Sequence, residues 1–332
     1  MSDTRTGSAG TARIGIVGLG RMGRRHARVF SASGPAEVVW TVDPGGHALD
    51  GVQSFPTVSR ALEAQVDGVI VAAPTVAHGE IAQQVIEAGV PCLVEKPLAA
   101  TAAEAAVLVA TANKRRVRLA TGHVERFNPA VIATRELLAS GRAGRPISLS
   151  FRRVGLPPAF APDVDVLSDL AVHDLDVCAF LLGLDERDPI RVTGAIGWPG
   201  NALFESALIL LDAAGIGTQI EVNWRTPTRI RRFSVTTDEC LIEVDYTTQI
   251  VEIVQRTEEL ELEDFAGFAS HYGSVLRTRL EVPTAEPLAG QAASFLAAVR
   301  GDPAALLASG VDGLRAIRLV EDARALALEN NS

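Results

Sequence analysis

The sequence has few cysteines and no long apolar run. Its 332 residues include three cysteines, Cys92, Cys178 and Cys240, which lie far apart in apolar stretches. This spacing excludes a CxxC motif, so we expect buried free thiols in a reducing compartment. The opening residues lack the apolar core of a signal peptide, and no stretch approaches the ~18 apolar residues of a membrane span. Together these absences predict a cytoplasmic protein.

Basic residues are outnumbered as well. Lysine and arginine total 31 against 40 acidic residues, which gives a net charge of −9 and a pI near 5.3. An acidic chain argues against nucleic acid or an anionic membrane as the main partner. The length suits two domains, and a hydrophobic content of 47% suffices for a sizeable core. We therefore expect a small-molecule partner.

A glycine-rich turn follows the first apolar strand. The turn consists of Gly18, Leu19, Gly20, Arg21, Met22 and Gly23. This is GxGxxG between a strand and a helix, the context of dinucleotide binding. Gly18 permits the tight turn, Gly20 lets the backbone approach a pyrophosphate, and Gly23 lets the helix pack on the strand, with the helix N-terminus toward the phosphates. A glycine turn in an unrelated α/β protein is the alternative.

The second predicted strand ends at an acid. Asp43 stands 25 residues after Gly18, and no arginine or lysine follows at once. A carboxylate at this place accepts hydrogen bonds from ribose hydroxyls and repels a 2′-phosphate. The sequence therefore favours NAD over NADP as the cofactor, unless Asp43 is only a turn residue before Pro44.

Two further predicted strands end at Pro74 and Pro97, at the spacing of an α/β fold. Ligands of parallel sheets meet the loops at the carboxyl ends of the strands. The cofactor-contact candidates in these loops are Pro74, Thr75, His78, Glu95 and Lys96. Lys96 leaves a buried strand, where an ammonium can polarise a substrate oxygen; a surface lysine is the alternative. We predict an NAD-binding domain over residues 11–124.

Residues 125–330 are predicted to form a second domain for substrate binding and oligomerisation. A helix starts at Pro129 with Asn128 as its N-cap. Six strand candidates alternate between residues 190 and 255 and are joined by short turns, which predicts a mostly antiparallel open sheet. The predicted fold class is α/β: an N-terminal doubly wound parallel sheet, then an α/β domain with a large, mostly antiparallel open sheet.

Three polar residues interrupt the apolar segment 168–183. At 100° per residue, His173 lies ~40° from Asp169 and Asp176 lies ~20° away on the other side, so all three share one stripe. A mostly buried helix places acids on a stripe only where that stripe borders something polar. A histidine with an ordinary pKa near 6.5 suits a base acting on an alcohol, and Asp169 can orient it. Asp176 can then bind another substrate hydroxyl.

Two alternative interpretations of this stripe stay open: a metal site, and a salt-bridged histidine in the core without a chemical role. A cluster of arginines is equally ambiguous. It comprises Arg152, Arg153, Arg229, Arg231 and Arg232. Such a cluster could hold an anionic group such as a sugar-linked phosphate, with Arg152 and Arg229 among the substrate contacts. A solvated basic sheet face or an oligomer contact would explain it as well.

The order of GLGRMG, then Glu95-Lys96-Pro97, then Asp169-xxx-His173-xx-Asp176 resembles the Gfo/Idh/MocA family of oxidoreductases, over about residues 12–328. The resemblance implies a nicotinamide cofactor and a homodimer or homotetramer formed through the open sheets. It also implies that Lys96 contacts substrate and cofactor, that His173 is the acid/base and that Asp169 is its partner. A cis Lys96–Pro97 bond is a further implication.

Segments 122–129 and 221–235 resemble the branch that contains UDP-N-acetylglucosamine 3-dehydrogenases. That resemblance implies substrate contacts by Arg126, Asn128, Trp224, Arg229 and Arg231. The chain departs from this branch at Arg225, where an apolar residue is usual, and at Arg229, where lysine is frequent. Asp163 and Asp165 add negative charge that could favour a cationic aminosugar, so both substrate types stay open.

We therefore predict a dehydrogenase that transfers a hydride between NAD and a secondary alcohol or ketone of a sugar, aminosugar or cyclitol. Lys96, Asp169 and His173 are its predicted catalytic residues, and no metal is expected. Two other functions remain open: a catalytically silent NAD- or sugar-binding regulator, and an NAD-dependent glycoside cleavage that begins with oxidation at C3.

Overall fold

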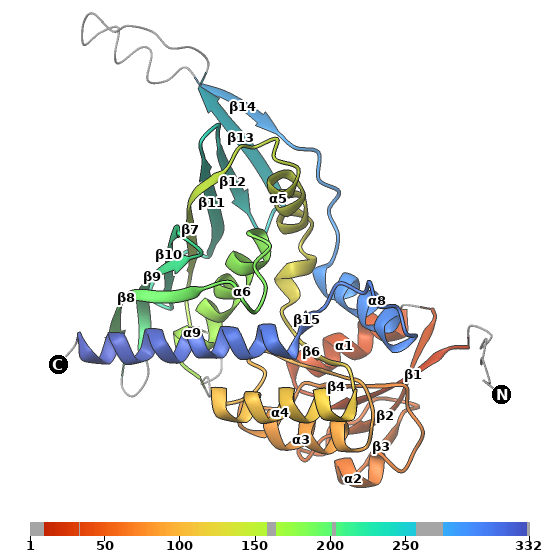
Figure 1. The fold of residues 1–332 in the computed structure, drawn as a ribbon. Coiled ribbons are helices and arrows are strands. Elements are labelled where there is room, and N and C mark those ends of the chain that lie inside the picture. Colours follow the sequence, from red (N-terminus) through yellow and green to blue (C-terminus); the bar gives the residue numbers. More distant parts are fainter. Residues whose placement is uncertain (1–9, 33, 158–163, 201–203, 257–274, 331–332) are drawn as a thin grey trace, which may run out of the picture. The chain divides into compact units, whose positions relative to one another are not determined.

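The computed structural model describes residues 10–32, 34–157, 164–200, 204–256 and 275–330 (Figure 1). The chain divides into two compact units. Unit 1 comprises Met1–Val124 and Leu288–Ile317, and unit 2 comprises Glu125–Pro287 and Arg318–Ser332. The sequence places all of 125–330 in one domain, whereas the structure groups residues 288–317 with unit 1. The reason is packing, since Phe295 lies fully buried against Phe30 of the first helix, ring edge to ring face.

Unit 1 contains a seven-stranded sheet in the order β15-β6-β5-β4-β1-β2-β3. The strands are β1 (Ala12–Val17), β2 (Ala36–Val42), β3 (Gln53–Phe55), β4 (Gly68–Val71), β5 (Cys92–Val94), β6 (Leu119–Thr121) and β15 (Ala308–Ser309). All neighbours pair in parallel except β15 with β6. The central strands are apolar throughout because helices cover both faces of such a sheet.

The helices of unit 1 pack on this sheet in two buried clusters. They are α1 (Arg21–Ala32), α2 (Val58–Ala61), α3 (Thr75–Glu87), α4 (Ala102–Arg115) and α8 (Pro287–Val299), together with the first part of α9 (Gly310–Glu329). Thr101 caps α4 by accepting a hydrogen bond from the Glu104 N–H at 3.2 Å. The doubly wound arrangement predicted from the sequence is confirmed.

Unit 2 contains an eight-stranded sheet in the order β14-β13-β12-β11-β7-β10-β9-β8. The strands are β7 (Pro146–Val154), β8 (Ile190–Pro199), β9 (Phe204–Ala213), β10 (Ile216–Asn223), β11 (Ile230–Thr237), β12 (Leu241–Asp245), β13 (Ile250–Arg256) and β14 (Val275–Arg279). Only β10 and β7 pair in parallel, so the predicted, mostly antiparallel sheet is confirmed.

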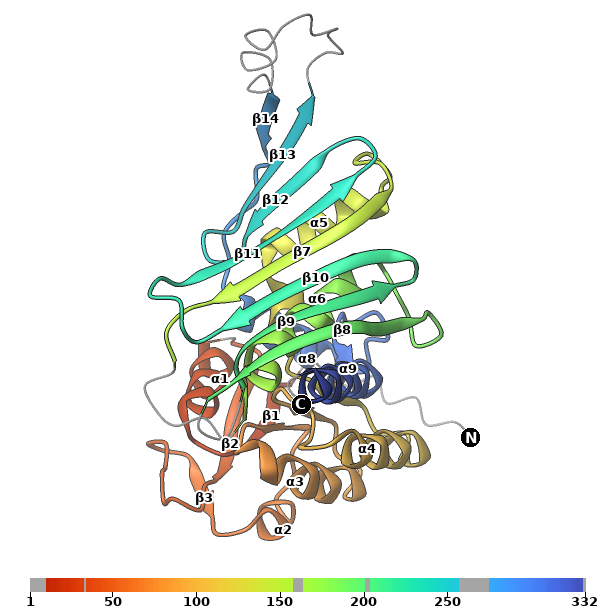
Figure 2. The same cartoon turned by 90° about the vertical axis from the view of Figure 1, so that its left-hand side faces the viewer.

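Helices of unit 2 cover one face of this sheet (Figure 2). They are the short 3-10 helix η1 (Val124–Phe127), α5 (Pro129–Ala139), the π-helical turn η2 (Leu167–Ala171) and α6 (Val172–Leu181). Asn128 caps α5, as predicted, by accepting the Ala130 N–H at 3.1 Å. In the part of the chain that the structure describes, no helix is both long and apolar enough to cross a membrane.

Candidate active site

The glycine turn between β1 and α1 has the shape that a dinucleotide requires. Gly18 adopts φ +88°, and a Cβ there would lie 2.6 Å from the Ala72 carbonyl oxygen. A Cβ at Gly23 would collide with the Gly18 carbonyl oxygen. Around Gly20, by contrast, a Cβ would meet nothing within 4 Å, so the backbone faces open space there. Because α1 starts at Arg21, the N-terminus of this helix lies at the turn, where a helix can bind a pyrophosphate.

Asp43 is bound to this same turn. Its Oδ2 accepts the Leu19 N–H at 2.6 Å, and its Oδ1 accepts the Gly45 N–H at 2.9 Å and lies 3.0 Å from His47 Nδ1. Burial raises the pKa of Asp43, but these hydrogen bonds together lower it by more than burial raises it. The pKa of Asp43 therefore lies below its ordinary value. The result is an ionised carboxylate fixed at the end of β2, a place suited to a ribose diol.

The His78 side chain connects two loops of unit 1. Its Nδ1 lies 2.8 Å from the Pro97 carbonyl oxygen and its Nε2 lies 2.9 Å from the Ala73 carbonyl oxygen, so both ring nitrogens face the main chain. The ring therefore joins the loop after β4 to the loop after β5. Its contact with the cofactor stays a prediction, as do those of Pro74, which directly precedes α3, and Thr75, the first residue of that helix.

The loop after β5 carries Lys96. The Lys96–Pro97 bond is cis, as the family resemblance predicts. Lys96 is half-buried, whereas Glu95 before it is buried. The Glu95 backbone N–H donates to the Val71 carbonyl oxygen at 2.8 Å, which keeps this loop in register with β4. The side chain of Lys96 is thus placed at the carboxyl end of the parallel sheet.

In unit 2, Asp169 and His173 lie at the exposed part of an otherwise buried segment. From residue 165 to residue 179, only Ser168, Asp169 and His173 keep more than slight exposure. Asp169 belongs to the π-helical turn, in which the Val172 N–H reaches back to the Leu167 carbonyl oxygen. A π-turn holds more residues than an α-turn, so the 100° step used on the sequence does not hold between Asp169 and His173. π-turns are frequent at functional sites.

Asp176 lies on the same helix but is buried, and it pairs with Arg126. The Arg126 Nε and Nη2 atoms donate to the Asp176 carboxylate at 2.9 Å and 2.6 Å. The guanidinium also lies 5.1 Å from the centre of the Phe180 ring. What the structure describes is therefore an internal pair, and the contact of either residue with substrate stays a prediction.

Asn128 is buried too, with its side chain fully engaged in unit 2. Besides capping α5, its Nδ2 donates to the Tyr246 carbonyl oxygen at 3.0 Å and to Glu125 Oε2 at 3.2 Å. These hydrogen bonds connect the start of α5 to the loop after β12. The predicted contact of Asn128 with substrate stays a prediction.

A buried network that the sequence analysis missed anchors this helix to the sheet. Arg153 of β7 donates from Nε and Nη2 to the two Asp174 carboxylate oxygens at 3.0 Å and 2.8 Å, and from Nη1 to Glu125 at 3.0 Å. The Tyr246 hydroxyl donates to Asp174 at 3.0 Å. Burial lowers the pKa of Arg153, but the charges of Asp174 and Glu125 raise it further. The sequence does contain a signal for this network, because Asp174 is a further acid in the apolar segment, next to His173, and it has no predicted partner.

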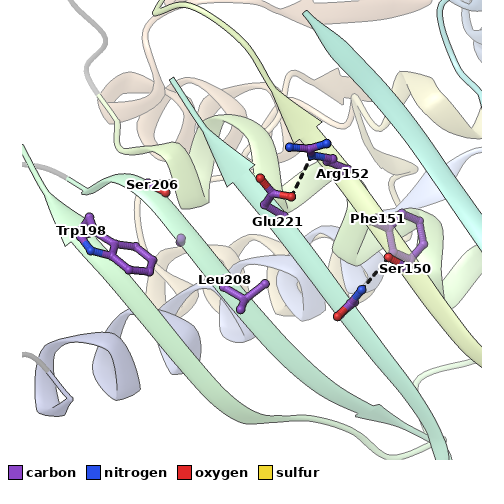
Figure 3. A pocket seen from close by; sticks show the side chains of 9 residues that line it. Ser150, Phe151, Arg152, Trp198, Ser206, Leu208 and Glu221 are labelled. Carbon is purple, nitrogen blue, oxygen red and sulfur yellow. Dashed lines mark hydrogen bonds and ion pairs between the residues drawn. The ribbon is translucent and has the colours of Figure 1, made fainter. Parts of the chain in front are cut away.

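The predicted arginine cluster does not form one surface. Side chains of successive strand residues point to opposite faces, and Arg153 contacts α6 while Arg152 lies on the other, uncovered face. There Arg152 pairs with Glu221 at 2.8 Å (Figure 3). Arg152 and the helix that contains His173 therefore lie on opposite faces of the sheet, and the contact of Arg152 with substrate stays a prediction.

Two arginines at the start of β11, Arg229 just before the strand and Arg231 within it, differ in exposure. Arg229 is exposed, whereas Arg231 is half-buried and donates to the Val154 and Ile230 carbonyl oxygens at 2.5 Å and 2.8 Å. Burial, with the charges of Arg153 and Arg229, lowers the pKa of Arg231 to about 10. Trp224 is buried at the end of β10. Of the predicted contacts in this segment, Arg229 is thus the accessible one.

The charge argument for a cationic substrate loses one of its two acids. Asp165 is buried and accepts two hydrogen bonds from Arg324, at 3.0 Å and 2.9 Å, so its charge is neutralised. Asp163 lies outside the described residues. Within the described ranges, no three or more His, Cys, Asp or Glu side chains gather as a metal site would require.

The glycine turn, the fixed acid after β2 and the parallel sheet define a dinucleotide-binding Rossmann fold in unit 1. The model of an oxidoreductase family with an NAD-binding Rossmann fold, Gfo/Idh/MocA, matches residues 12–123. Inositol 2-dehydrogenase 1 of Saccharopolyspora erythraea is 33% identical over 228 residues, which is 64% of this chain and 67% of that protein. The chain belongs to the Gfo/Idh/MocA family of oxidoreductases.

Two other similarities are to a nucleotide-sugar dehydrogenase and to a protein with bound NAD. UDP-N-acetylglucosamine 3-dehydrogenase of Acidithiobacillus ferrooxidans is 32% identical over 206 residues, or 60% of this chain and 63% of that protein. The match thus spans less than two thirds of that relative. The crystal structure of GenD2 from gentamicin A biosynthesis in complex with NAD superposes with a TM-score of 0.77 at 25% identity, covering 97% of this chain and 95% of the other.

Proposed function

We propose that this chain is an NAD-dependent dehydrogenase acting on a secondary alcohol, or the matching ketone, of a sugar, aminosugar or cyclitol. The observation that carries the proposal is the pair Asp169 and His173, which with Ser168 are the part-exposed residues of the otherwise buried segment 165–179. Unit 1 of the same chain adds a turn shaped for a dinucleotide. The names of the relatives, an inositol dehydrogenase and a nucleotide-sugar dehydrogenase, support the substrate class.

In this proposal the protein residues handle the proton and the charge. NAD, when bound, supplies the hydride acceptor. His173 takes the hydroxyl proton during oxidation and returns it during reduction. Asp169 stabilises the imidazolium that forms, and the ammonium of Lys96 stabilises the negative charge that develops on the substrate oxygen. This assignment requires Lys96 and His173 to act on the same carbon–oxygen group.

The cofactor preference follows from Asp43. Its hydrogen bonds keep the carboxylate ionised at neutral pH. A fixed negative charge at the end of β2 repels a 2′-phosphate, which only NADP carries. We infer a preference for NAD.

The substrate contacts are proposed at two levels. Lys96, Asp169, His173 and Arg229 contact the substrate directly, because each keeps some exposure. Arg126 and Asp176 act as a hydrogen-bonded pair, and Asn128 and Trp224 are further proposed contacts that are buried in this structure. Arg229 favours substrates that carry an anionic group.

The uncovered face of the unit 2 sheet supports a homodimer or homotetramer. Several apolar side chains are exposed there: Ile196, Trp198, Leu208 and Leu210. Of these, Trp198 and Leu208 line a hollow of about 580 Å³ together with Arg152 and Glu221 (Figure 3). Exposed apolar groups gathered on one sheet face are typical of an interface between subunits.

Absorbance at 340 nm tests the activity. The protein is mixed with NAD and with UDP-N-acetylglucosamine, myo-inositol, scyllo-inositol, simple hexoses or an aminoglycoside with a free 3″-hydroxyl. We expect NADH to form with one substrate class and a ketone to accumulate. Release of an aglycone would instead identify glycoside cleavage. NADH binding without turnover in either direction would contradict the proposal and indicate a silent binding protein.

A further inference from the structure

A buried hydrogen-bonded pair joins α1 to the loop that carries Lys96. His26 of α1 and Glu95 are almost closed to solvent, with 1% and 7% of their surfaces exposed. His26 Nε2 lies 2.7 Å from Glu95 Oε1. The other carboxylate oxygen of Glu95 accepts the backbone N–H of Lys96 at 3.2 Å. One carboxylate therefore connects the His26 ring to the main chain of Lys96.

The charge state of this pair follows from its surroundings. Burial raises the pKa of Glu95, but the hydrogen bond from His26 and the nearby charge of Lys96 lower it further, to below the ordinary value. An ionised carboxylate only accepts hydrogen bonds, so the proton of the short contact sits on His26 Nε2. The contact is a charge-assisted hydrogen bond, which is stronger than one between neutral groups.

The pair is held in a tight space. A Cβ at Gly122, just after β6, would lie 2.9 Å from Glu95 Cα and 3.0 Å from Glu95 Oε2. On the other side, the His26 ring stacks against Phe30 with 6.4 Å between the ring centres. Neither side chain can move far without displacing its neighbours.

The pair also carries a cost in stability. Among the described residues, His26 Nδ1 has no hydrogen-bond partner although it is buried. A buried polar atom without a partner destabilises the folded state. An apolar side chain at position 26 would avoid this cost, but it would leave the buried carboxylate of Glu95 without its hydrogen-bond donor.

We propose that His26 is a positioning residue for the reaction. It acts through Glu95: it fixes the carboxylate, the carboxylate fixes the Lys96 main chain, and Lys96 is thereby held where it meets the substrate oxygen. Because α1 starts directly after the glycine turn, one helix both faces the phosphates and holds the lysine loop. The proposal rests on the function proposed above, and it adds a residue that contacts neither substrate nor cofactor.

Lys96 can be observed directly, because the chain has only two lysines, Lys96 and Lys114. Reductive methylation with ¹³C-formaldehyde gives one NMR signal for each lysine and one for the N-terminus, and Lys114→Arg assigns them. His26→Phe keeps a ring but removes the donor. His26→Gln keeps an N–H near the place of Nε2. Val29→Ala, at a buried position of α1, is the control for a loss of packing.

We expect the Lys96 signal to shift in His26→Phe, to return in His26→Gln and to stay unchanged in Val29→Ala. On the substrate found at 340 nm, His26→Phe lowers kcat about tenfold to a hundredfold, since a displacement near 1 Å at the reacting groups costs about that much. The affinity for NADH, measured by fluorescence, and the KM for NAD stay within about twofold.

An unmoved Lys96 signal and an unchanged kcat in folded His26→Phe would overturn the proposal. If that variant does not fold, Glu95→Gln gives the same test, because it keeps the shape of Glu95 and removes its charge. The two proposals fail separately. A wild-type protein without turnover contradicts the dehydrogenase function, whereas the NMR signal decides the role of His26 in either case.

Discussion

Arg153 and Asp174 form a two-hydrogen-bond ion pair, at 3.0 Å and 2.8 Å, that is almost completely buried between β7 and α6. Asp174 is the residue after His173, so this pair fixes the turn of the helix that presents the proposed base. The Arg153 guanidinium also lies 4.7 Å from the centre of the Tyr246 ring, which closes the other side. A rigid support of this kind is what a positioned acid/base needs.

Breaking this pair should destabilise unit 2 strongly. Arg153→Met leaves the Asp174 charge buried without its partner, at a cost of about 3–5 kcal/mol. Urea unfolding followed by tryptophan fluorescence measures the loss. Arg232→Met is the control, because its pair with Asp245 is largely exposed at Arg232 and should be worth at most ~1 kcal/mol. Equal losses in both variants would contradict the role given to the buried pair.

Removing the charge of Asp43 should change the cofactor preference. Asp43→Ala loses the ribose contact and the repulsion of a 2′-phosphate. The binding of NADH should therefore weaken much more than the binding of NADPH. Fluorescence titration of both nucleotides gives the two Kd values. Glu37→Ala, an exposed acid on the same strand, should change neither. An equal loss for NADH and NADPH would show that Asp43 does not discriminate between them.

Glu95 should make unit 1 sensitive to acid. Its pKa is lowered in the folded protein, so its stabilising contribution is present above the ordinary glutamate pKa of about 4.3 and is lost as the pH falls through the folded-state value. When the melting temperature is plotted against pH between pH 7 and pH 3, it should therefore fall less steeply for Glu95→Gln than for the wild type. Parallel curves would mean that Glu95 has the same pKa in both states.

Charges placed on the uncovered sheet face should separate the subunits. Trp198→Asp and Leu210→Asp each put a carboxylate among the exposed apolar side chains, at positions that are 56% and 47% exposed. Sedimentation velocity should then show a smaller species than the wild type. Leu306→Asp, equally accessible but in unit 1, should leave the size unchanged. A wild-type monomer would refute the proposed assembly outright.

The sequence predicted the elements of both sheets because their signals are local. The apolar strands, the glycine turn and the Asn128 cap each depend on a few neighbouring residues. The stripe of Asp169, His173 and Asp176 was predicted less well. A π-turn interrupts the helical period at Asp169, and Asp176 turns out to be buried against Arg126. Neither feature can be read from a fixed step of 100° per residue.

Contacts between residues that lie far apart in the chain could also not be predicted from the sequence. His26 lies 69 residues before Glu95, and nothing in the glycine motif marks it as the partner of a distant acid. Arg152 and Arg153 look alike in the sequence, but the sheet sends one to the helices and the other to the uncovered face. Pairing of this kind depends on the register of strands and helices, which only the fold supplies.

The role of His173 is the central claim, and one rapid-mixing measurement tests it most directly. NADH formation at 340 nm is recorded for the wild type and for His173→Ala, each saturated with NAD and mixed with the substrate found in the screen. We predict that His173→Ala slows hydride transfer by about 10²- to 10⁴-fold while its affinity for NADH stays the same. A variant that transfers hydride at nearly the wild-type rate would contradict the assignment of His173 as the base.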